Sequence, residues 1–165
     1  MFTGKHALVI DNGSDTCKVG FATDKQPRAA VPSIVGHPRA PGSDGDHLGS
    51  YVGEEAESKR AILDVVHPIE RGVIVNWDDA QLLWQHAFLK ALGVVPEQHA
   101  VLLAESPLSE NGDRERITEI MFETFRVPAA YLANQCALAI FTTGRTSGVV
   151  LDSGDGVTHA LRPTE

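Results

Sequence analysis

The sequence predicts an α/β protein in which a mixed β-sheet carries flanking helices. Apolar runs typical of strands alternate with helical patterns in the second half of the chain, which gives the order β-β-β and then β-α-β-α-β. The 165 residues, of which 42% are hydrophobic and 22% charged, are enough to bury one core and are not typical of a disordered chain.

Three extended segments open the chain. Residues 7–10 form a short apolar run that ends in a polar turn, and residues 17–22 alternate as a returning strand. Residues 27–35 read as a third strand, and Pro27 and Pro32 place it at an edge, because proline cannot donate to the hydrogen-bond ladder. The three segments predict a meander.

The next part of the chain is predicted to be mostly irregular. Residues 36–50 are crowded with Gly, Pro and Asp and are expected to form an exposed, mobile loop. Residues 53–60 predict a short helix with acids in its first turn and bases in its last, which suits the helix dipole. After Pro68 the chain is expected to be extended again.

Helices and strands then alternate. Asn76 is predicted to cap a helix that runs to about Gly93, with Asp78 and Asp79 in its first turn. Its expected apolar stripe consists of Leu82, Leu83, His86, Ala87 and Leu92. The segments after it are predicted as a buried parallel strand at 101–104, a helix at 113–125, a strand at 131–133, a helix at 135–142 and a strand at 148–152.

The net charge and the cysteines indicate which binding partners and which cellular location to expect. The formal net charge is -8 and no cluster of Lys and Arg is present, which disfavours binding to nucleic acid or to an anionic membrane. Cys17 and Cys136 form no CxxC pair and read as reduced thiols. Residues 1–6 contain no long apolar segment, so the expected location is the cytoplasm, with the nucleus as a further possibility.

Two segments share one design that is suited to phosphate. Residues 8–14 and 149–156 each have an apolar run, then Asp, a small polar residue and Gly. Glycine lets successive backbone N–H groups line one concavity, and an Asp at a strand tip can hold hydrated Mg²⁺, so Asp11 and Asp152 are candidate metal residues. Lys18 can reach a phosphate oxygen as a point charge. The pair predicts a phosphate clamp.

Either segment alone has an ordinary explanation, because an apolar strand followed by Asp-x-Gly also begins many hairpins. Two matching copies favour the phosphate site over simple turn chemistry.

Longer strings resemble the actin family at matching spacing. The first is Asp11-Asn12-Gly13-Ser14 followed by residues 17–18 and 20–21. The others are residues 27–29, 32–36, 50–53, 58–60, 68–70, 76–79, 120–125, 144–146 and 152–159. Essentially the whole chain resembles the N-terminal portion of an actin or actin-related protein.

The resemblance implies an actin-like, ribonuclease-H-like fold, with a first domain over residues 1–146 that includes a small exposed subdomain at about 33–70. Residues 147–165 would be the opening hairpin of a second domain that is only begun. The implied function is that of a cytoskeletal protein that binds ATP or ADP with Mg²⁺ and belongs to an ATP-hydrolysing family.

The resemblance also implies individual roles. Asp11 and Asp152 match the residues that hold Mg²⁺ through water, Gln135 the glutamine that orients water, and His159 the histidine that helps to organise it. The implied nucleotide-binding residues are Asn12, Gly13, Ser14, Asp15, Thr16, Lys18, Ser153, Gly154, Asp155, Gly156 and Val157. Without the resemblance, Gln135 reads as a residue at a helix start and His159 as a hydrogen-bonded strand histidine.

Two residues and one loop depart from the family pattern. Asp15 replaces a glycine of the first phosphate loop, so an inward-facing carboxylate would repel the phosphates of ATP. The loop from Arg39 to Gly49 is shorter than the DNase-binding loop of actin and has Asp44 and Asp46 in place of apolar side chains, which disfavours ordinary polymerisation. Arg71 stands in place of a histidine that becomes methylated in actin.

The chain ends just after the second loop, before the adenine-binding residues of the family. Three explanations stay open: part of a longer protein, a short actin-like protein held in an assembly, or a degraded remnant. The first function hypothesis is therefore an actin-family nucleotide-binding protein whose site is incomplete in this chain. The alternative is a non-enzymatic subunit docked to other actin-like subunits or a larger cytoskeletal complex, with a partner covering the hairpin at 149–161.

Overall fold

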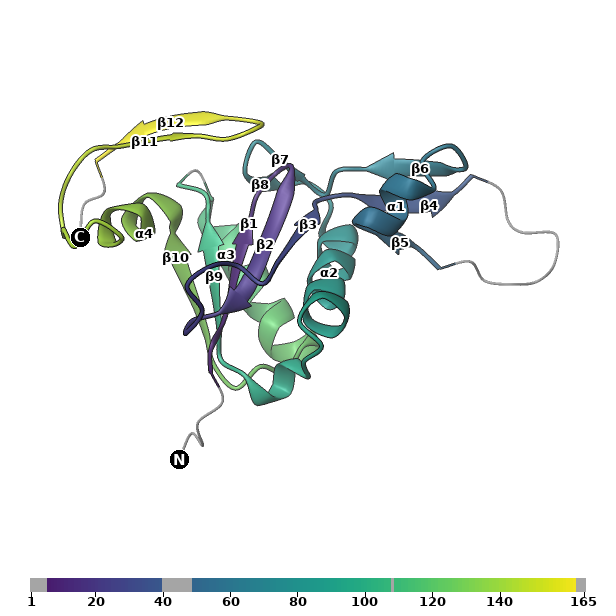
Figure 1. Cartoon of the computed structure of the whole chain (residues 1–165), viewed down its shortest axis with the longest axis horizontal. Coiled ribbons are helices and arrows are strands. Elements are labelled where there is room, and N and C mark those ends of the chain that lie inside the picture. The colour runs from purple at the N-terminus through teal and green to yellow at the C-terminus, as the bar shows by residue number, and fades with distance from the viewer. Residues whose placement is uncertain (1–5, 40–48, 108, 163–165) are drawn as a thin grey trace.

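A five-stranded mixed sheet lies at the centre of the computed structural model, which describes residues 6–39, 49–107 and 109–162. The strand order is β10-β9-β1-β2-β3 (Figure 1). Its strands are β1 (Leu8–Asn12), β2 (Thr16–Phe21), β3 (Ala29–Pro32), β9 (Val101–Glu105) and β10 (Ala130–Asn134). The first three pair antiparallel, whereas β1, β9 and β10 run parallel. The predicted α/β class, the meander and the buried parallel strand are confirmed.

The third predicted strand is at an edge, as Pro27 and Pro32 indicated, but it is shorter than expected. β3 ends at Pro32, and the chain turns at Ser33 and Ile34 before it enters a second sheet. The amide of Ser33 donates to the carbonyl of Asp15 rather than to a strand neighbour, and this bond ends the ladder.

A second sheet contradicts part of the predicted loop at 36–50. It consists of β4 (Val35–Pro38), β5 (Tyr51–Val52) and β6 (Leu63–Val66), with α1 (Glu54–Ser58) packed on it. Gly36 is buried in β4, and a Cβ there would lie 2.6 Å from Leu63 Cδ1, so glycine permits the close packing. The rest of that predicted loop, residues 40–48, lies outside the described residues, together with Asp44 and Asp46.

The helix at 53–60 is present but shorter than predicted. α1 has acids in its first turn and no base in its last, so the expected match of basic residues to the helix dipole was wrong. Lys59 is already the C-cap, and its ammonium lies 3.7 Å from the centre of the Tyr51 ring. A cation over an aromatic face explains where this charge goes.

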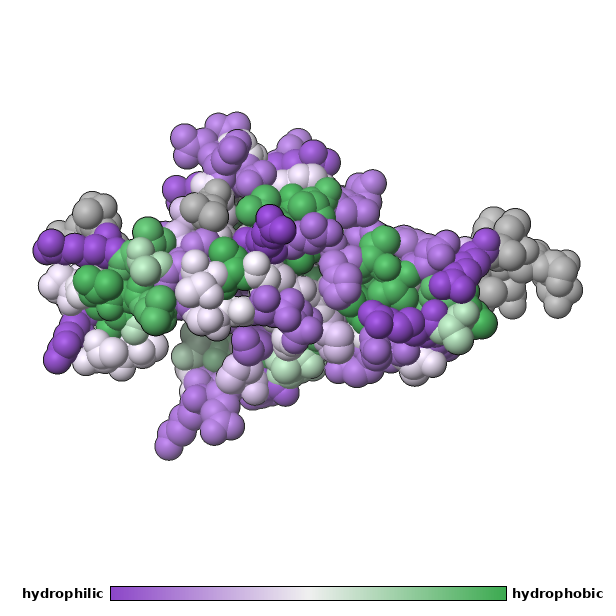
Figure 2. All heavy atoms as spheres, turned by 90° about the horizontal axis from the view of Figure 1, so that it is seen from above, coloured by the Kyte–Doolittle hydropathy of each residue, from purple (hydrophilic) through white to green (hydrophobic). Residues whose placement is uncertain are grey.

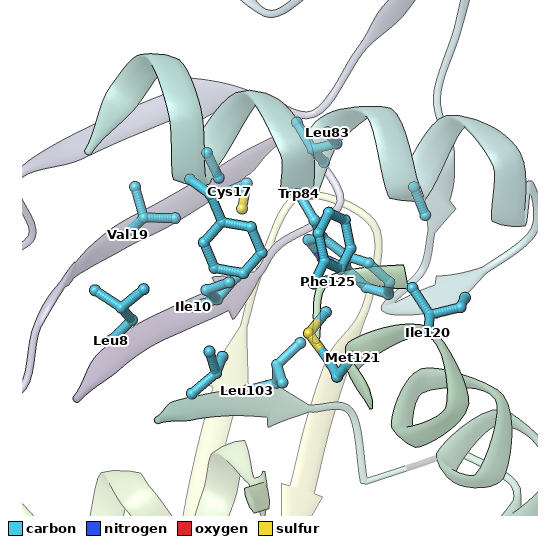
Figure 3. Close-up of a cluster of buried hydrophobic side chains, with 14 of the residues drawn as sticks. Leu8, Ile10, Cys17, Val19, Leu83, Trp84, Leu103, Ile120, Met121 and Phe125 are labelled. Carbon is cyan, nitrogen blue, oxygen red and sulfur yellow. The ribbon is translucent and has the colours of Figure 1, made fainter. Parts of the chain in front are cut away.

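Helices cover one face of the central sheet and close the core (Figure 3). They are α2 (Trp77–His86), which continues as the π-helical turn η1 (Ala87–Ala91), and α3 (Asn111–Glu119), which continues as η3 (Ile120–Thr124). A 3₁₀ turn, η2 (Pro96–Gln98), links α2 to β9. Trp84 and Phe88 are fully buried here, whereas the predicted stripe named Leu82 and His86, which are only partly buried. Leu83 and Ala87 are buried and Leu82 and Leu92 pack against the core, so the predicted stripe is confirmed in part, but it lacked Trp84 and Phe88.

The remaining elements lie at one end of the central sheet. They are β7 (Ile69–Glu70), β8 (Val73–Ile74), α4 (Gln135–Phe141), β11 (Val150–Ser153) and β12 (Thr158–Leu161). α4 contacts β9, β10 and β11, and β11 pairs with β12 in a separate two-stranded sheet. No helix in the described ranges is both long and apolar enough to cross a bilayer. The division into domains stays a prediction.

A buried carboxylate joins the second sheet to α2. Asn76 accepts the amide of Asp79 at 3.1 Å as the predicted N-cap, and its side-chain amide donates to the Asp79 carboxylate at 2.7 Å. The same carboxylate lies 3.0 Å from His37 Nε2 on β4, and His37 Nδ1 lies 3.0 Å from Ser50 Oγ. This chain of contacts fixes the start of α2 against β4.

We expect Asn76→Ala to lower the free energy of unfolding by about 1–2 kcal/mol, because both the cap and a partner of the buried Asp79 carboxylate are lost. Urea denaturation followed by circular dichroism measures the change. Asn111→Ala, at an exposed residue in the first turn of α3, is the control and is expected to change stability little. Equal stability of the two variants would contradict the role of the cap.

Candidate functional site

One cleft contains residues from both predicted phosphate turns. It has a volume of about 730 Å³ and is lined by the turn after β1, the start of β2, the first residues of α4 and the β11–β12 hairpin. Figure 1 shows this hairpin lying across the end of the sheet at which β1 and β2 meet. All the predicted site residues line the cleft except Ser153, whose hydroxyl lies 2.9 Å from Thr158 Oγ1.

Each carboxylate oxygen of Asp11 has a partner among the residues that line the cleft. Gln135 Nε2 donates to Asp11 Oδ1 at 3.0 Å, and Lys18 Nζ lies 3.5 Å from Asp11 Oδ2. Lys18 is the register partner of Asp11 across the β1–β2 ladder, and Gln135 begins α4 directly after β10. The side chains come from three elements, so only the folded sheet brings them together.

The first turn is held from behind by Ser33. Ser33 is fully buried; its hydroxyl donates to the carbonyl of Gly13 at 2.7 Å, and its amide donates to the carbonyl of Asp15 at 2.7 Å. In a trans peptide the C=O and the next N–H point in opposite directions, so the amides of Ser14 and Thr16 point away from Ser33. A Cβ at Gly13 would lie 2.5 Å from the Thr16 carbonyl, so this turn requires glycine.

A third turn connects the two phosphate turns. Arg71 and Gly72 form the two-residue hairpin between β7 and β8, with φ of 52° and 78°. The amide of Gly72 donates to Ser14 Oγ at 2.9 Å. A Cβ at Gly156 would lie 3.0 Å from the Arg71 nitrogen and 3.4 Å from Ser14 Oγ, so the second turn packs closely on the first and third.

Asp152 and His159 are register partners in the β11–β12 hairpin, and both line the cleft. His159 Nε2 is buried and has no hydrogen-bond partner within the described part of the chain. Buried polar atoms normally have a partner, so a ring nitrogen of this kind at a cleft is suited to bind a ligand or water. This does not match the expectation of a hydrogen-bonded strand histidine.

Asn12 has a structural contact as well as a place in the cleft wall. Its side chain is on the core side of β1, where Asn12 Oδ1 accepts the indole N–H of Trp84 at 2.8 Å. Both residues are buried. The amide oxygen of Asn12 is therefore engaged in fixing β1 to α2.

The charges of the cleft are unevenly placed. Four carboxylates line it, those of Asp11, Asp15, Asp152 and Asp155, whereas Lys18 is its one Lys or Arg within the described residues. Asp15 is exposed and accepts the hydroxyl of Thr16 at 2.7 Å. Asp15 also lines the cleft, so its carboxylate borders the hollow.

The residues present fit a phosphate chain with Mg²⁺. Glycines make the close approach of the turns possible, Asp11 and Asp152 offer the hard oxygen atoms that Mg²⁺ takes, and Lys18 offers a cation. No group of three or more His, Cys, Asp or Glu side chains is placed to ligate a metal directly in residues 6–39, 49–107 and 109–162. A metal held by two carboxylates through water is consistent with that arrangement.

Both cysteines lie next to cleft residues in the sequence, and their thiols are poor nucleophiles. Burial, with a smaller effect of the nearby Asp11 carboxylate, raises the pKa of the Cys17 thiol to about 12. Burial, and then the Asp152 carboxylate, raises the pKa of Cys136. Protonated, buried thiols are poor nucleophiles, and both cysteines are free.

Sequence reasoning missed Ser33 and the Arg71–Gly72 turn as parts of the site. The turn had a signal, because a Gly-containing dipeptide between two short apolar runs predicts a two-residue hairpin. Ser33 had none, since its contact with the first turn depends on how β3 ends. Gly72 and Ser106 also line the cleft and touch each other, with a Cβ at Gly72 placed 3.0 Å from Ser106 Oγ.

We expect Ser33→Ala to lower the free energy of unfolding by about 1–3 kcal/mol, because it leaves the Gly13 carbonyl without its buried donor. Chemical denaturation is the measurement. Ser58→Ala is the matched control, since Ser58 also donates to a carbonyl, that of Glu55, but is exposed on α1. A loss of stability no larger than that of the control would show that Ser33 does not hold the turn.

Comparison with known proteins agrees with this geometry. The family model described as Actin matches residues 3–162 of the chain. The match includes the central mixed sheet, the flanking helices and both turns of the cleft. The resemblance in the sequence is confirmed, and the protein belongs to the actin family.

Proposed function

We propose that this protein is an actin-like component of the cytoskeleton whose cleft holds the phosphates of ATP or ADP with Mg²⁺. The observation that carries the proposal is that the two Asp-x-Gly turns, from opposite ends of the chain, line one hollow together with Gln135 and His159. Turns that served only to reverse strands would have no reason to face each other. A location in the cytoplasm or nucleus belongs to the same proposal.

Residues of the first turn would bind the phosphates through the backbone. The Ser33 contacts direct the amides of Ser14 and Thr16 away from the core side, and two neighbouring N–H groups of this kind attract an anion. Lys18 adds a positive charge on β2, where it is the register partner of Asp11. Gly154, Asp155, Gly156 and Val157 would supply the opposite wall.

Asp11 and Asp152 would hold Mg²⁺ through water, and the metal would neutralise phosphate charge when bound. The Gln135 side-chain amide donates to Asp11, so its amide oxygen would accept a hydrogen bond from a water beside the metal residues. His159 would receive a hydrogen bond or donate one through its unpartnered Nε2. These two residues would orient water for hydrolysis, as the family membership suggests.

We expect the chain to bind Mg-ADP or Mg-ATP, and Asp152→Asn to weaken binding at least tenfold, because one carboxylate that holds the metal is lost. Isothermal titration calorimetry at fixed free Mg²⁺ measures this. Glu115→Gln, on the exposed face of α3, removes the same charge outside the cleft and is expected to bind as the parent does. Absence of any binding by the folded parent chain would contradict the proposed function.

A second candidate function is that of a docked, non-enzymatic subunit, and a separate observation favours it. Large apolar side chains are exposed on β10, α4 and the hairpin: Tyr131 is 67% exposed, Phe141 59%, Val149 76% and Leu151 72%. Figure 2 shows apolar residues gathered at the end of the molecule where α4 and the hairpin lie. Contiguous apolar surface of this kind marks an interaction site.

The occupant of that surface would be another actin-like subunit or a larger cytoskeletal complex, which would cover the hairpin at 149–161. Among the described residues the strands of the β11–β12 sheet pair only with each other, so their outer edges are available for strand addition. This candidate does not exclude nucleotide binding, because the exposed side chains of Phe141 and Val149 do not line the cleft, although that of Leu151 does.

Under the docking hypothesis we expect the isolated chain to self-associate, and Val149→Glu to reduce that association, because a carboxylate replaces an exposed apolar side chain outside the cleft. Sedimentation velocity over a range of concentrations is the measurement, with Ile62→Glu, at an exposed apolar residue away from that surface, as control. A parent chain that stays monomeric at all concentrations and unfolds in one cooperative transition would contradict obligate docking.

A further inference from the structure

We propose that the cleft selects nucleoside diphosphates over triphosphates and that Asp15 sets this preference. The inference rests on the proposed nucleotide site and adds the class of ligand that the site retains. It is drawn from where the charges lie along the cleft rather than from their total.

Lys18 lies in the strand ladder beside one carboxylate, whereas two other carboxylates lie in the turns. Lys18 is paired with Asp11 in the strand ladder, and its ammonium lies 3.5 Å from Asp11 Oδ2. Asp15 and Asp155 lie beyond the ladders, in the turns that follow β1 and β11. The single lysine of the cleft is thus paired with Asp11, while both turns carry carboxylates.

The two turns are neighbours, so a phosphate between them meets both carboxylates. A Cβ at Gly156 would lie 3.4 Å from Ser14 Oγ, and Gly156 and Ser14 are each adjacent in sequence to one of the two acids. Both turns line the same hollow. A phosphoryl group held by the backbone of both turns therefore lies in the field of Asp15 and Asp155.

The Asp15 carboxylate has no compensating cation. Its Oδ2 accepts the Thr16 hydroxyl at 2.7 Å, and neither Asp15 nor Asp155 forms an ion pair within the described part of the chain. Asp11, in contrast, is paired with Lys18 and Gln135. This hydrogen bond holds the Asp15 carboxylate at the turn, and Asp15 lines the cleft, so its negative charge borders the proposed phosphate position.

The third phosphate of a nucleotide brings about one further negative charge into this field. Because Asp15 is exposed, solvent and salt reduce the repulsion, and we expect it to weaken triphosphate binding relative to diphosphate binding by about fivefold at low ionic strength. Bound Mg²⁺ offsets part of the charge of either nucleotide, so the two must be compared at equal free Mg²⁺.

The test compares the affinities of Mg-ADP and Mg-ATP for the parent chain, Asp15→Asn and the control Glu115→Gln, by isothermal titration at low and at high salt. Asparagine keeps the shape of the side chain and can still accept the Thr16 hydroxyl. We expect Asp15→Asn to tighten ATP binding more than ADP binding, so that the ratio of the two dissociation constants moves about fivefold. High salt is expected to shrink the difference between the variants, and the control is expected to keep the parent ratio.

Binding of both nucleotides with the same ratio in the parent and in Asp15→Asn would overturn this inference and leave the proposed function intact. Binding of both nucleotides to Asp15→Asn alone, and of neither to the parent, would also overturn it, since Asp15 would then exclude the diphosphate as well. Binding of neither nucleotide to either folded protein, as judged by circular dichroism, would overturn the proposed function and this inference together.

Discussion

The parallel pairing of β1 with β9, and of β9 with β10, is the constraint on which the site depends. It requires crossover connections, which α2 with η1 and α3 with η3 supply, and these helices bury the core on one face of the sheet. Parallel strands end at the same edge, so Asp11 at the end of β1 and Gln135 just after β10 meet there. A contact between residues 124 positions apart is therefore a direct result of strand order.

A second constraint is the junction of three turns above that edge. Three residues from distant parts of the chain pack together there: Ser14, Gly72 and Gly156. The two glycines permit close approach, and the Ser14 hydroxyl oxygen accepts the amide N–H of Gly72. Ser33 supports the junction from the core side. The Arg71–Gly72 turn, which joins β7 and β8, contacts both phosphate turns. A ligand held between the phosphate turns would therefore lie close to this third turn.

The cleft and the exposed apolar surface are two features of the same hairpin. Along β11, Asp152 is partly buried at the cleft, whereas Leu151 and Ser153 are exposed, which follows from the alternation of side chains along a strand. Asp152 can contact a ligand while Phe141 and Val149, which do not line the cleft, are covered by a partner. The two proposed functions are thus compatible in physical terms, and binding at one face would stabilise the hairpin for the other.

The sequence by itself determined the order of the central-sheet strands and of the helices, the N-cap at Asn76, the edge position of β3 and the two Asp-x-Gly turns, because these depend on local periodicity, proline and capping chemistry. It did not determine the second sheet at Gly36, the burial of Trp84 and Phe88, or the support of the first turn by Ser33. Those features arise from contacts between segments far apart in the chain, for which a local pattern holds no information. The tertiary structure alone decided that the hollow between the turns is lined, among the described residues, by four carboxylates and one lysine, because charge balance in a cleft is set by which elements pack together.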